Sequence, residues 1–171
     1  MIYRITHIEQ PYSGEYEEKI YDIESSWNSR DWSWIKFEEE LSIWCGEFRG
    51  KYRGTALSEK RGIVVVLTSD YMYILDIETK DMIDYEEQPS YTEITCTPMG
   101  DIFLSDGYGL YIFTGKKIES LNSIFLPVQV DFLKFVAYDG KMLKMSCEEF
   151  RNCSNQITLL LDCESLEVME G

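Results

Sequence analysis

The chain has 171 residues, of which 44% are hydrophobic and 14% aromatic, and this composition is too apolar for a disordered segment. Its 31 acidic and 16 basic residues give a net charge of −15, which would repel nucleic acids and anionic membrane surfaces. From the length we expect a single domain over 1–171, with N-terminal strands and a tryptophan-rich segment in 1–53 and three repeats in 54–171.

The chain shows no sign of export or membrane insertion. The opening residues MIYRITHIEQPYSGEYEE have neither the basic region nor the apolar stretch of a signal peptide. The longest apolar run, Ile63–Leu67, is far shorter than the roughly 20 residues that cross a bilayer. The cysteines are odd in number and match no disulfide framework; they are Cys45, Cys96, Cys147, Cys153 and Cys163. We therefore expect a cytoplasmic protein with free thiols.

The N-terminal part contains two expected strands, MIYRITHI and EKIYDIES, followed by a tryptophan-rich segment. All four tryptophans lie between residues 25 and 53, namely Trp27, Trp32, Trp34 and Trp44. The helical spacing of Trp34, Phe37, Leu41 and Trp44, with Gly46 as a stop, predicts a short helix at about 34–44. The alternative is a strand through WSWIKF with Trp32 and Trp34 on one face. The tryptophans either build a core or serve as interface anchors.

From about residue 54 the sequence repeats itself. The units read GTALSEKRGIVVVLTSDYMYILDIETKDMI, YTEITCTPMGDIFLSDGYGLYIFTGKKIES, and VDFLKFVAYDGKMLKMSCEEF with QITLLLDCESLEV following. In each, an apolar segment runs into a turn glycine (Gly62, Gly100 or Gly140), and two further strands follow. A period near 40 with several short strands is typical of a β-meander array. Asp139-Gly140 predicts a two-residue hairpin turn with positive φ at both positions.

These repeats resemble the blades of β-propellers, in which strands such as YILDIETKDMI and LYIFTGKKIES are common. The resemblance covers about residues 54–168. It implies an all-β fold of antiparallel meanders, either an open propeller-like array or a curved sandwich. Typical propellers have four to eight blades, so the N-terminal strands could supply a sheet beyond the three repeats.

No motif indicates catalysis, a metal or a cofactor. The usual base of nucleophilic catalysis is histidine, and the chain has only His7. The spacing of Cys147, Cys153 and Cys163 fits no zinc site. DIETKDMIDYEE lacks the glycine of a calcium loop, and SDGYG matches no phosphate-binding loop. We expect a non-enzymatic protein; a carboxylate-dependent hydrolase is the remaining enzymatic alternative.

Two acidic stretches are the candidate partner-binding residues. They comprise Glu15, Glu17, Glu18, Asp22, Glu24 and Asp31 in the first, and Asp81, Asp84, Glu86 and Glu87 in the second. Grouped on one surface, such carboxylates would attract a basic protein and accelerate the encounter; on separate faces they would serve solubility alone. A basic cluster either faces this acidic side or meets carboxylates of a partner; it consists of Arg49, Lys51, Arg53, Lys60 and Arg61.

In size, acidity and lack of catalytic residues the chain resembles the immunity proteins of bacterial toxin systems, including contact-dependent growth inhibition. The segment WIKFEEELSIWCGEFRG is the aromatic and acidic centre of this resemblance. It implies a one-to-one complex with a basic protein, a nuclease toxin domain, whose basic surface the chain occludes without binding nucleic acid or membrane. The alternative is a propeller-like interaction scaffold or complex subunit without catalytic activity.

Overall fold

The computed structural model describes all residues from Met1 to Gly171 and confirms the all-β prediction. It contains sixteen β-strands and one 3-10 helix, η1 (Ile118–Ser120), but no α-helix. None of its helical structure has the length and apolarity needed to cross a membrane. The strands form four separate four-stranded sheets. The fold divides into two compact units, Met1–Pro89 (unit 1) and Ser90–Gly171 (unit 2).

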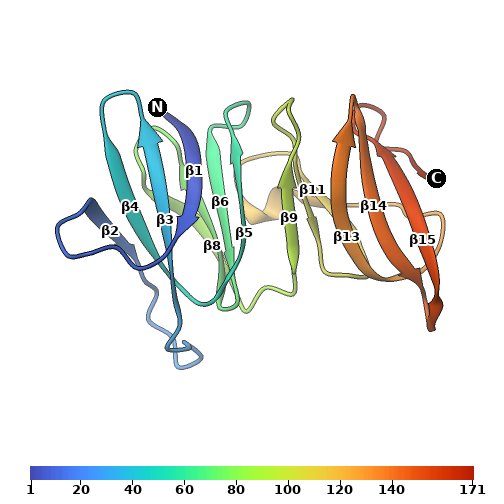
Figure 1. Ribbon diagram of the computed structural model, residues 1–171, viewed down its shortest axis with the longest axis horizontal. Coiled ribbons are helices and arrows are strands. Elements are labelled where there is room, and N and C mark those ends of the chain that lie inside the picture. The colour runs from blue at the N-terminus through green and yellow to red at the C-terminus, as the bar shows by residue number, and fades with distance from the viewer. The chain divides into compact units, whose positions relative to one another are not determined.

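Sheet A of unit 1 is built from the N-terminal strands and the tryptophan-rich segment (Figure 1). Its strands, in the spatial order β1-β3-β4-β2, are β1 (Ile2–Ile8), β3 (Trp32–Glu39), β4 (Ile43–Arg49) and β2 (Glu17–Tyr21). β3 is antiparallel to both β1 and β4, whereas β2 is parallel to β4. The N-terminal strands therefore supply a fourth sheet in addition to the three repeats, and β2 forms one edge of it.

Each predicted repeat forms one antiparallel meander, as the period near 40 indicates. Sheet B, in unit 1, consists of β5 (Tyr52–Ser58), β6 (Ile63–Thr68), β7 (Tyr71–Asp76) and β8 (Met82–Glu87). Sheet C, in unit 2, consists of β9 (Glu93–Cys96), β10 (Ile102–Ser105), β11 (Leu110–Phe113) and β12 (Leu121–Ile124). Sheet D, also in unit 2, consists of β13 (Val130–Asp139), β14 (Met142–Glu149), β15 (Asn152–Asp162) and β16 (Val168–Glu170). Sheets B, C and D thus each have four strands, one more than the three that the repeat pattern indicates.

The predicted helix at about 34–44 is wrong, and the alternative strand through WSWIKF is correct. Residues 34–39 belong to β3, which turns into β4 at residues 40–42. Burial in β3 alternates with period two: Ile35 and Phe37 are fully buried, whereas Trp34 faces the other side of the sheet. Leu41, expected on the buried helical stripe, is 99% exposed at the turn. Pairing with the flanking strands outweighs the coincidental helical spacing.

The turn glycines of the repeats adopt the positive φ angles that side chains disfavour. Gly62, Gly100 and Gly140 have φ of 66°, 85° and 58°. The turn between β13 and β14 is shifted by one residue from the expected Asp139-Gly140. Asp139 pairs with Met142, so the two loop residues are Gly140 and Lys141. Positive φ occurs only at Gly140, as a type II′ turn requires.

Each unit contains its own apolar core. In unit 1 the core joins sheet A to sheet B, where Phe48 meets Tyr73 edge-on at 5.1 Å between ring centroids. In unit 2, Phe103 and Leu110 of sheet C belong to the same core as Leu143 and Leu159 of sheet D. Burying one such side chain contributes about 1.5–3 kcal/mol, so these cores hold the sheets of each unit together.

A candidate protein-binding surface around strand β2

Alternate residues of strand β2 face inward and attach the strand to the core of unit 1 and to the β7–β8 turn. Tyr21 is buried and stacks on Phe48 at 4.8 Å, and its hydroxyl donates a hydrogen bond of 2.6 Å to the carbonyl of Lys80. The ammonium of Lys19 donates to the same carbonyl at 2.7 Å and forms a 3.1 Å ion pair with Asp81. Glu18 and Ile20, which alternate with these residues, therefore point to the other face of sheet A.

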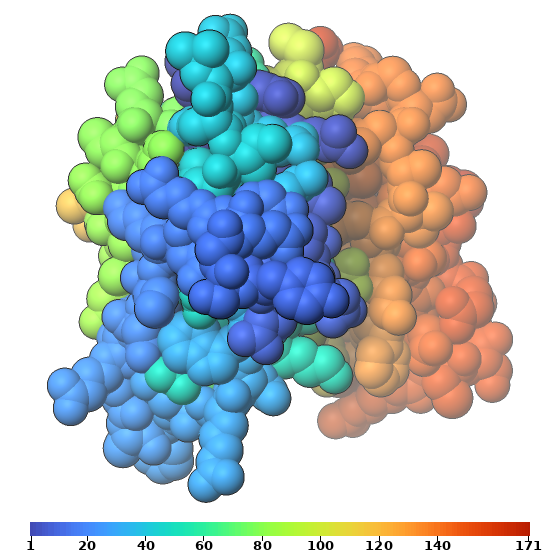
Figure 2. All heavy atoms as spheres, turned by 60° about the vertical axis from the view of Figure 1, so that its left-hand side comes forward, coloured from blue at the N-terminus to red at the C-terminus, as the bar shows by residue number.

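That outer face presents carboxylates beside apolar side chains. In the register, Glu18 lies opposite Cys45, Ile20 lies opposite Glu47, and Glu47 lies opposite Trp34 on the next strand. Ile20 is 62% exposed although it is large and apolar. We call Glu15, Glu18, Ile20 and Glu47 the β2 surface; Glu17 alternates with Lys19 and Tyr21 and therefore points to the opposite face of sheet A. In Figure 2 the residues before and within β2, in blue, form the front of unit 1, and the β3–β4 turn, in cyan, projects above them.

The carboxylates of Glu18 and Glu47 repel each other without a compensating cation. Neither forms an ion pair within unit 1. Burial raises the pKa of Glu47, the charge of Glu18 raises it further, and the indole N–H of Trp34 lowers it in part. A lysine or arginine from a partner would relieve this repulsion, because an opposite charge favours the ionised form of the Glu47 carboxyl.

Cys45 lies beneath these carboxylates on the same face. Its side chain is fully buried, and burial raises the pKa of the thiol to about 11, with the nearby Glu47 and Glu18 adding to the effect. The thiol therefore stays protonated at neutral pH and is not an activated nucleophile.

A second group of carboxylates is already neutralised by the protein itself. Asp22 accepts two hydrogen bonds from Arg49, with Nη2 at 2.6 Å and Nε at 3.0 Å, and this contact lowers the pKa of the Asp22 carboxyl. The guanidinium of Arg49 also lies 4.1 Å from the ring centroid of Trp32. The basic cluster was expected either to face the acidic side of its own chain or to meet carboxylates of a partner. Arg49 does the former, because it contacts Asp22.

The predicted candidate residues are divided among several places. Seven lie within or next to β2 and its flanking loops or contact them; they are Glu15, Glu17, Glu18, Asp22, Glu24, Asp81 and, through a 3.5 Å contact with Ser25, Glu87. Asp84 and Glu86 lie opposite Ile74 and Met72, so they point to the other face of sheet B. Asp31 is exposed just before β3.

Sequence reasoning missed Glu47. The signal that finds it is the alternation of β4, in which Trp44 and Phe48 face the core while Cys45 and Glu47 face outward. The same alternation separates the tryptophans, because Trp44 is buried, Trp32 and Trp34 are partly exposed and Trp27 is 76% exposed in the loop before β3. Core and surface roles are thus divided among them.

The only histidine of the chain lies in β1, outside the β2 surface. The single histidine, His7, stacks on Tyr52 with 4.0 Å between ring centroids. No group of three or more histidine, cysteine, aspartate or glutamate side chains is arranged to hold a metal ion. What the arrangement offers chemically is negative charge beside exposed apolar area.

Comparison with known proteins gives fold similarity alone. No family model and no curated protein matches the sequence. The extracellular domain of BT4673 from B. thetaiotaomicron is similar over 80% of this chain, with a TM-score of 0.52 and 11% identity. The N-terminal domain of Nup159 (TM-score 0.47, 10% identity) and the β-propeller domain of Cps50 (Swd1) from Myceliophteria thermophila (0.42, 12%) each align with 71% of it. The chain spans 20%, 34% and 38% of these three proteins, respectively.

Proposed function

We propose that the protein binds a basic partner protein through the β2 surface and acts without catalysis. The observation that carries the proposal is the Glu18–Glu47 pair, two carboxylates on adjacent strands without a counter-ion and next to Trp34. An interface needs apolar anchors as well as charge, and the exposed Ile20 beside Glu47 supplies one.

The charge of the whole chain supports the same proposal. The net charge of −15 attracts a basic protein and accelerates its approach. Such electrostatic steering raises association rates by about 10- to 1000-fold. The partner's cations then reach carboxylates whose mutual repulsion they relieve. The encounter rate and the stability of the complex therefore depend on the same residues.

In its specific form, the proposal is that the chain is an immunity protein of a bacterial toxin system, acting in the cytoplasm. A nuclease toxin binds polyanions, so its functional surface is basic and complementary to the β2 surface. Covering that surface in a one-to-one complex would exclude nucleic acid and abolish the toxin's activity.

Co-expression with the product of the adjacent reading frame tests this function. We expect a one-to-one complex on size-exclusion chromatography with light scattering, and loss of the partner's nuclease activity when the chain is added. Free nuclease activity in the presence of excess chain contradicts the immunity proposal.

The second candidate is a propeller-like interaction scaffold or complex subunit. The regular repetition of three four-stranded meanders favours it, because such sheets offer extended surfaces independently of charge. A scaffold would bind its partner with an affinity that changes little between low and physiological salt, whereas steered binding of a basic toxin weakens as salt rises.

A further inference from the structure

Sheet D of unit 2 has a strand whose outer edge is only partly covered. β15 contains eleven residues, but β16 pairs with Leu159–Leu161 alone. Beyond this short pairing, Gly171 N–H donates to the carbonyl of Thr158 at 3.0 Å. Residues 152–156 are exposed. At about 3.3 Å per residue, the uncovered edge from 152 to 157 has room for roughly 20 Å of extended chain.

Backbone groups of β15 point into this uncovered space. Thr158 and Asp162 direct theirs toward β16, as the bonds from Gly171 N–H to Thr158 and from Asp162 N–H to Glu167 show. Alternation places the N–H and C=O of Gln156 on the same side, and Gln156 pairs only with Glu148 of β14 on the other. No backbone group of the protein bonds to Gln156 from that side. An edge of this kind accepts an added strand.

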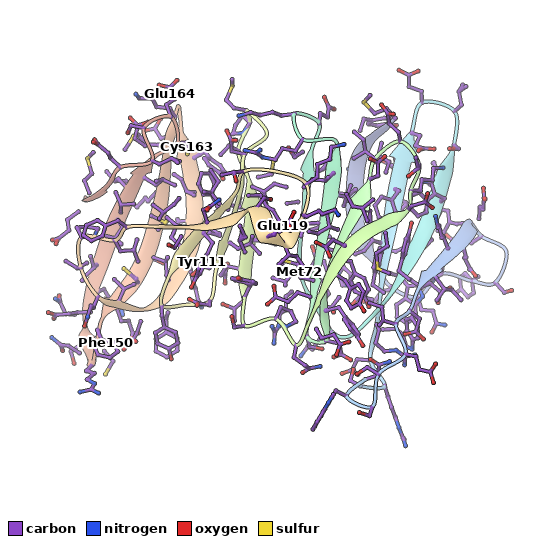
Figure 3. The ribbon with its side chains drawn as sticks, turned by 180° about the vertical axis from the view of Figure 1, so that it is seen from behind. Met72, Tyr111, Glu119, Phe150, Cys163 and Glu164 are labelled. Atoms are coloured by element: carbon purple, nitrogen blue, oxygen red, sulfur yellow. The ribbon has the colours of Figure 1, made fainter.

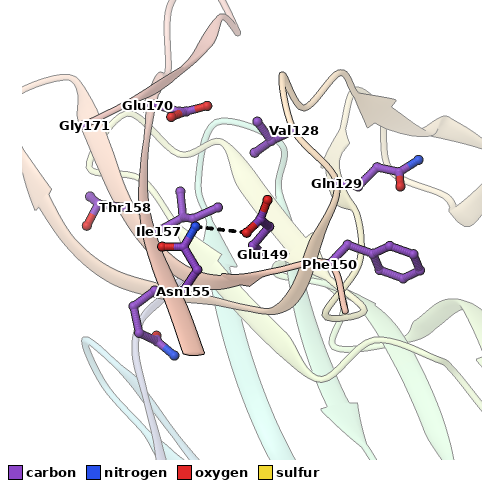
Figure 4. A pocket seen from close by; sticks show the side chains of 10 residues that line it. Val128, Gln129, Glu149, Phe150, Asn155, Ile157, Thr158, Glu170 and Gly171 are labelled. Carbon is purple, nitrogen blue, oxygen red and sulfur yellow. Dashed lines mark hydrogen bonds between the residues drawn. The ribbon is translucent and has the colours of Figure 1, made fainter. Parts of the chain in front are cut away.

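A pocket lies beside the uncovered edge (Figure 4). Its volume is about 600 Å³, and its walls include Val128, Ile157 and Phe150, with Glu149 and Glu170 as the charged groups. No lysine or arginine lines it. In Figure 3, Phe150 lies at one end of sheet D, whereas Cys163 and Glu164 lie at the other.

Glu149 is held in a defined position at this pocket. Its Oε2 accepts hydrogen bonds from Asn155 at 3.0 Å and Asn152 at 2.7 Å. These amides lower the pKa of the carboxyl, so the group is ionised at neutral pH. The Oε1 atom forms no hydrogen bond within the protein. Its position suits a cation that enters the pocket.

We propose that unit 2 binds an extended basic peptide segment, which adds a strand to the β15 edge at Gln156 and places a lysine or arginine side chain between Glu149 and Glu170. The aliphatic part of that side chain packs on Val128 and Ile157, while its charge meets the two carboxylates. The β-pairing gives affinity without reading sequence, and the pocket selects positive charge. This site is separate from the β2 surface and does not depend on its proposed function.

The probe is the synthetic peptide acetyl-Lys-Val-Lys-Val-Lys-Val-amide, titrated into the uniformly ¹⁵N-labelled full chain. We expect saturable shifts at the amides of Gln156, Thr158 and Gly171, and slower hydrogen exchange at Gln156. A peptide that is N-methylated at alternate residues keeps its charge but loses half of its donors, and it should leave these amides unshifted.

Charge selection is tested by the double variant Glu149→Gln with Glu170→Gln, which should weaken peptide binding about tenfold. Glu164→Gln, an exposed carboxylate at the opposite end of sheet D that pairs with Lys141, is the control and should bind as the wild type does. Shifts confined to unit 1, equal binding of the N-methylated peptide, or dimerisation of the free chain through β15 would overturn the proposal. The first of these outcomes would leave the β2 proposal intact.

Discussion

Phe37 and Trp44 stack face to face across the β3–β4 pair, with ring centroids 4.1 Å apart and planes 8° from parallel. They are opposite each other in the strand register, and both are buried in the core of unit 1. Because this contact crosses a hairpin, it fixes which residues of β3 and β4 face outward. The orientation of Trp34 and Glu47 on the β2 surface follows from it.

We expect Phe37→Ala to lower the free energy of unfolding by about 3–5 kcal/mol, because it removes a fully buried ring and leaves a cavity in the core. Leu41→Ala should change stability by less than about 0.5 kcal/mol, since Leu41 is 99% exposed. Urea denaturation followed by tryptophan fluorescence measures both. A large loss for Leu41→Ala would indicate the helical stripe after all.

Two glycines with positive φ should respond differently to alanine. At Gly140, a Cβ atom would meet nothing within 4 Å, so the cost is conformational and about 1 kcal/mol. At Gly50, the Cβ would lie 2.5 Å from Thr68 Oγ1 and 2.8 Å from the backbone nitrogen of Asp70, and we expect about 3 kcal/mol. Thermal unfolding ranks the variants. Equal losses would mean that the close approach of these segments does not constrain Gly50.

The Asp22–Arg49 pair should make stability depend on pH in the acid range. The pKa of Asp22 is lowered in the folded state from an ordinary value of 3.8, so its contribution is present above that value and is lost as pH falls through the folded pKa. Asp22→Asn should therefore destabilise the protein at pH 7 by at most about 1 kcal/mol, because Asp22 is 37% exposed and solvent screens the pair. Urea midpoints of the wild type and variant should converge near pH 2.

The contribution of Glu47 to stability should depend on pH in the opposite direction to that of Asp22. Its pKa is raised in the folded state, so the protonated form is favoured on folding and its contribution is lost as pH rises through the folded pKa. Glu47→Gln removes a repelled charge and should stabilise the protein at pH 7, by less than about 1 kcal/mol, with no gain at pH 3. A variant less stable at pH 7 than the wild type would show that Glu47 is paired.

Much of the fold follows from the sequence because meanders are local. The turn glycines at residues 62, 100 and 140 and the apolar runs between them place three sheets in correct order. The helix assignment failed at 34–44, where Trp34, Phe37 and Leu41 match a period of 3.6 by coincidence and the pairing partner β1 is distant in sequence. Tertiary pairing, which local spacing does not encode, decided between the two periods.

The candidate surface was less accessible to prediction. Asp81 lies near β2, the strand that contains Glu18, because Lys19 of β2 contacts the β7–β8 turn. The two segments are some sixty residues apart in the sequence. That Glu86 faces away from Glu87 depends on strand alternation in β8. Charge counting identifies acidic stretches, but only strand register shows which carboxylates share a face.

The association rate of the chain with its basic partner tests the central claim most directly. We expect the double variant Glu18→Gln with Glu47→Gln to associate about tenfold more slowly at low salt and to show a shallower dependence on ionic strength than the wild type. Glu119→Gln, an exposed carboxylate of η1 in unit 2, should associate at the wild-type rate. Identical rates and salt dependences for the double variant and the wild type would contradict the assignment of the β2 surface as the binding site.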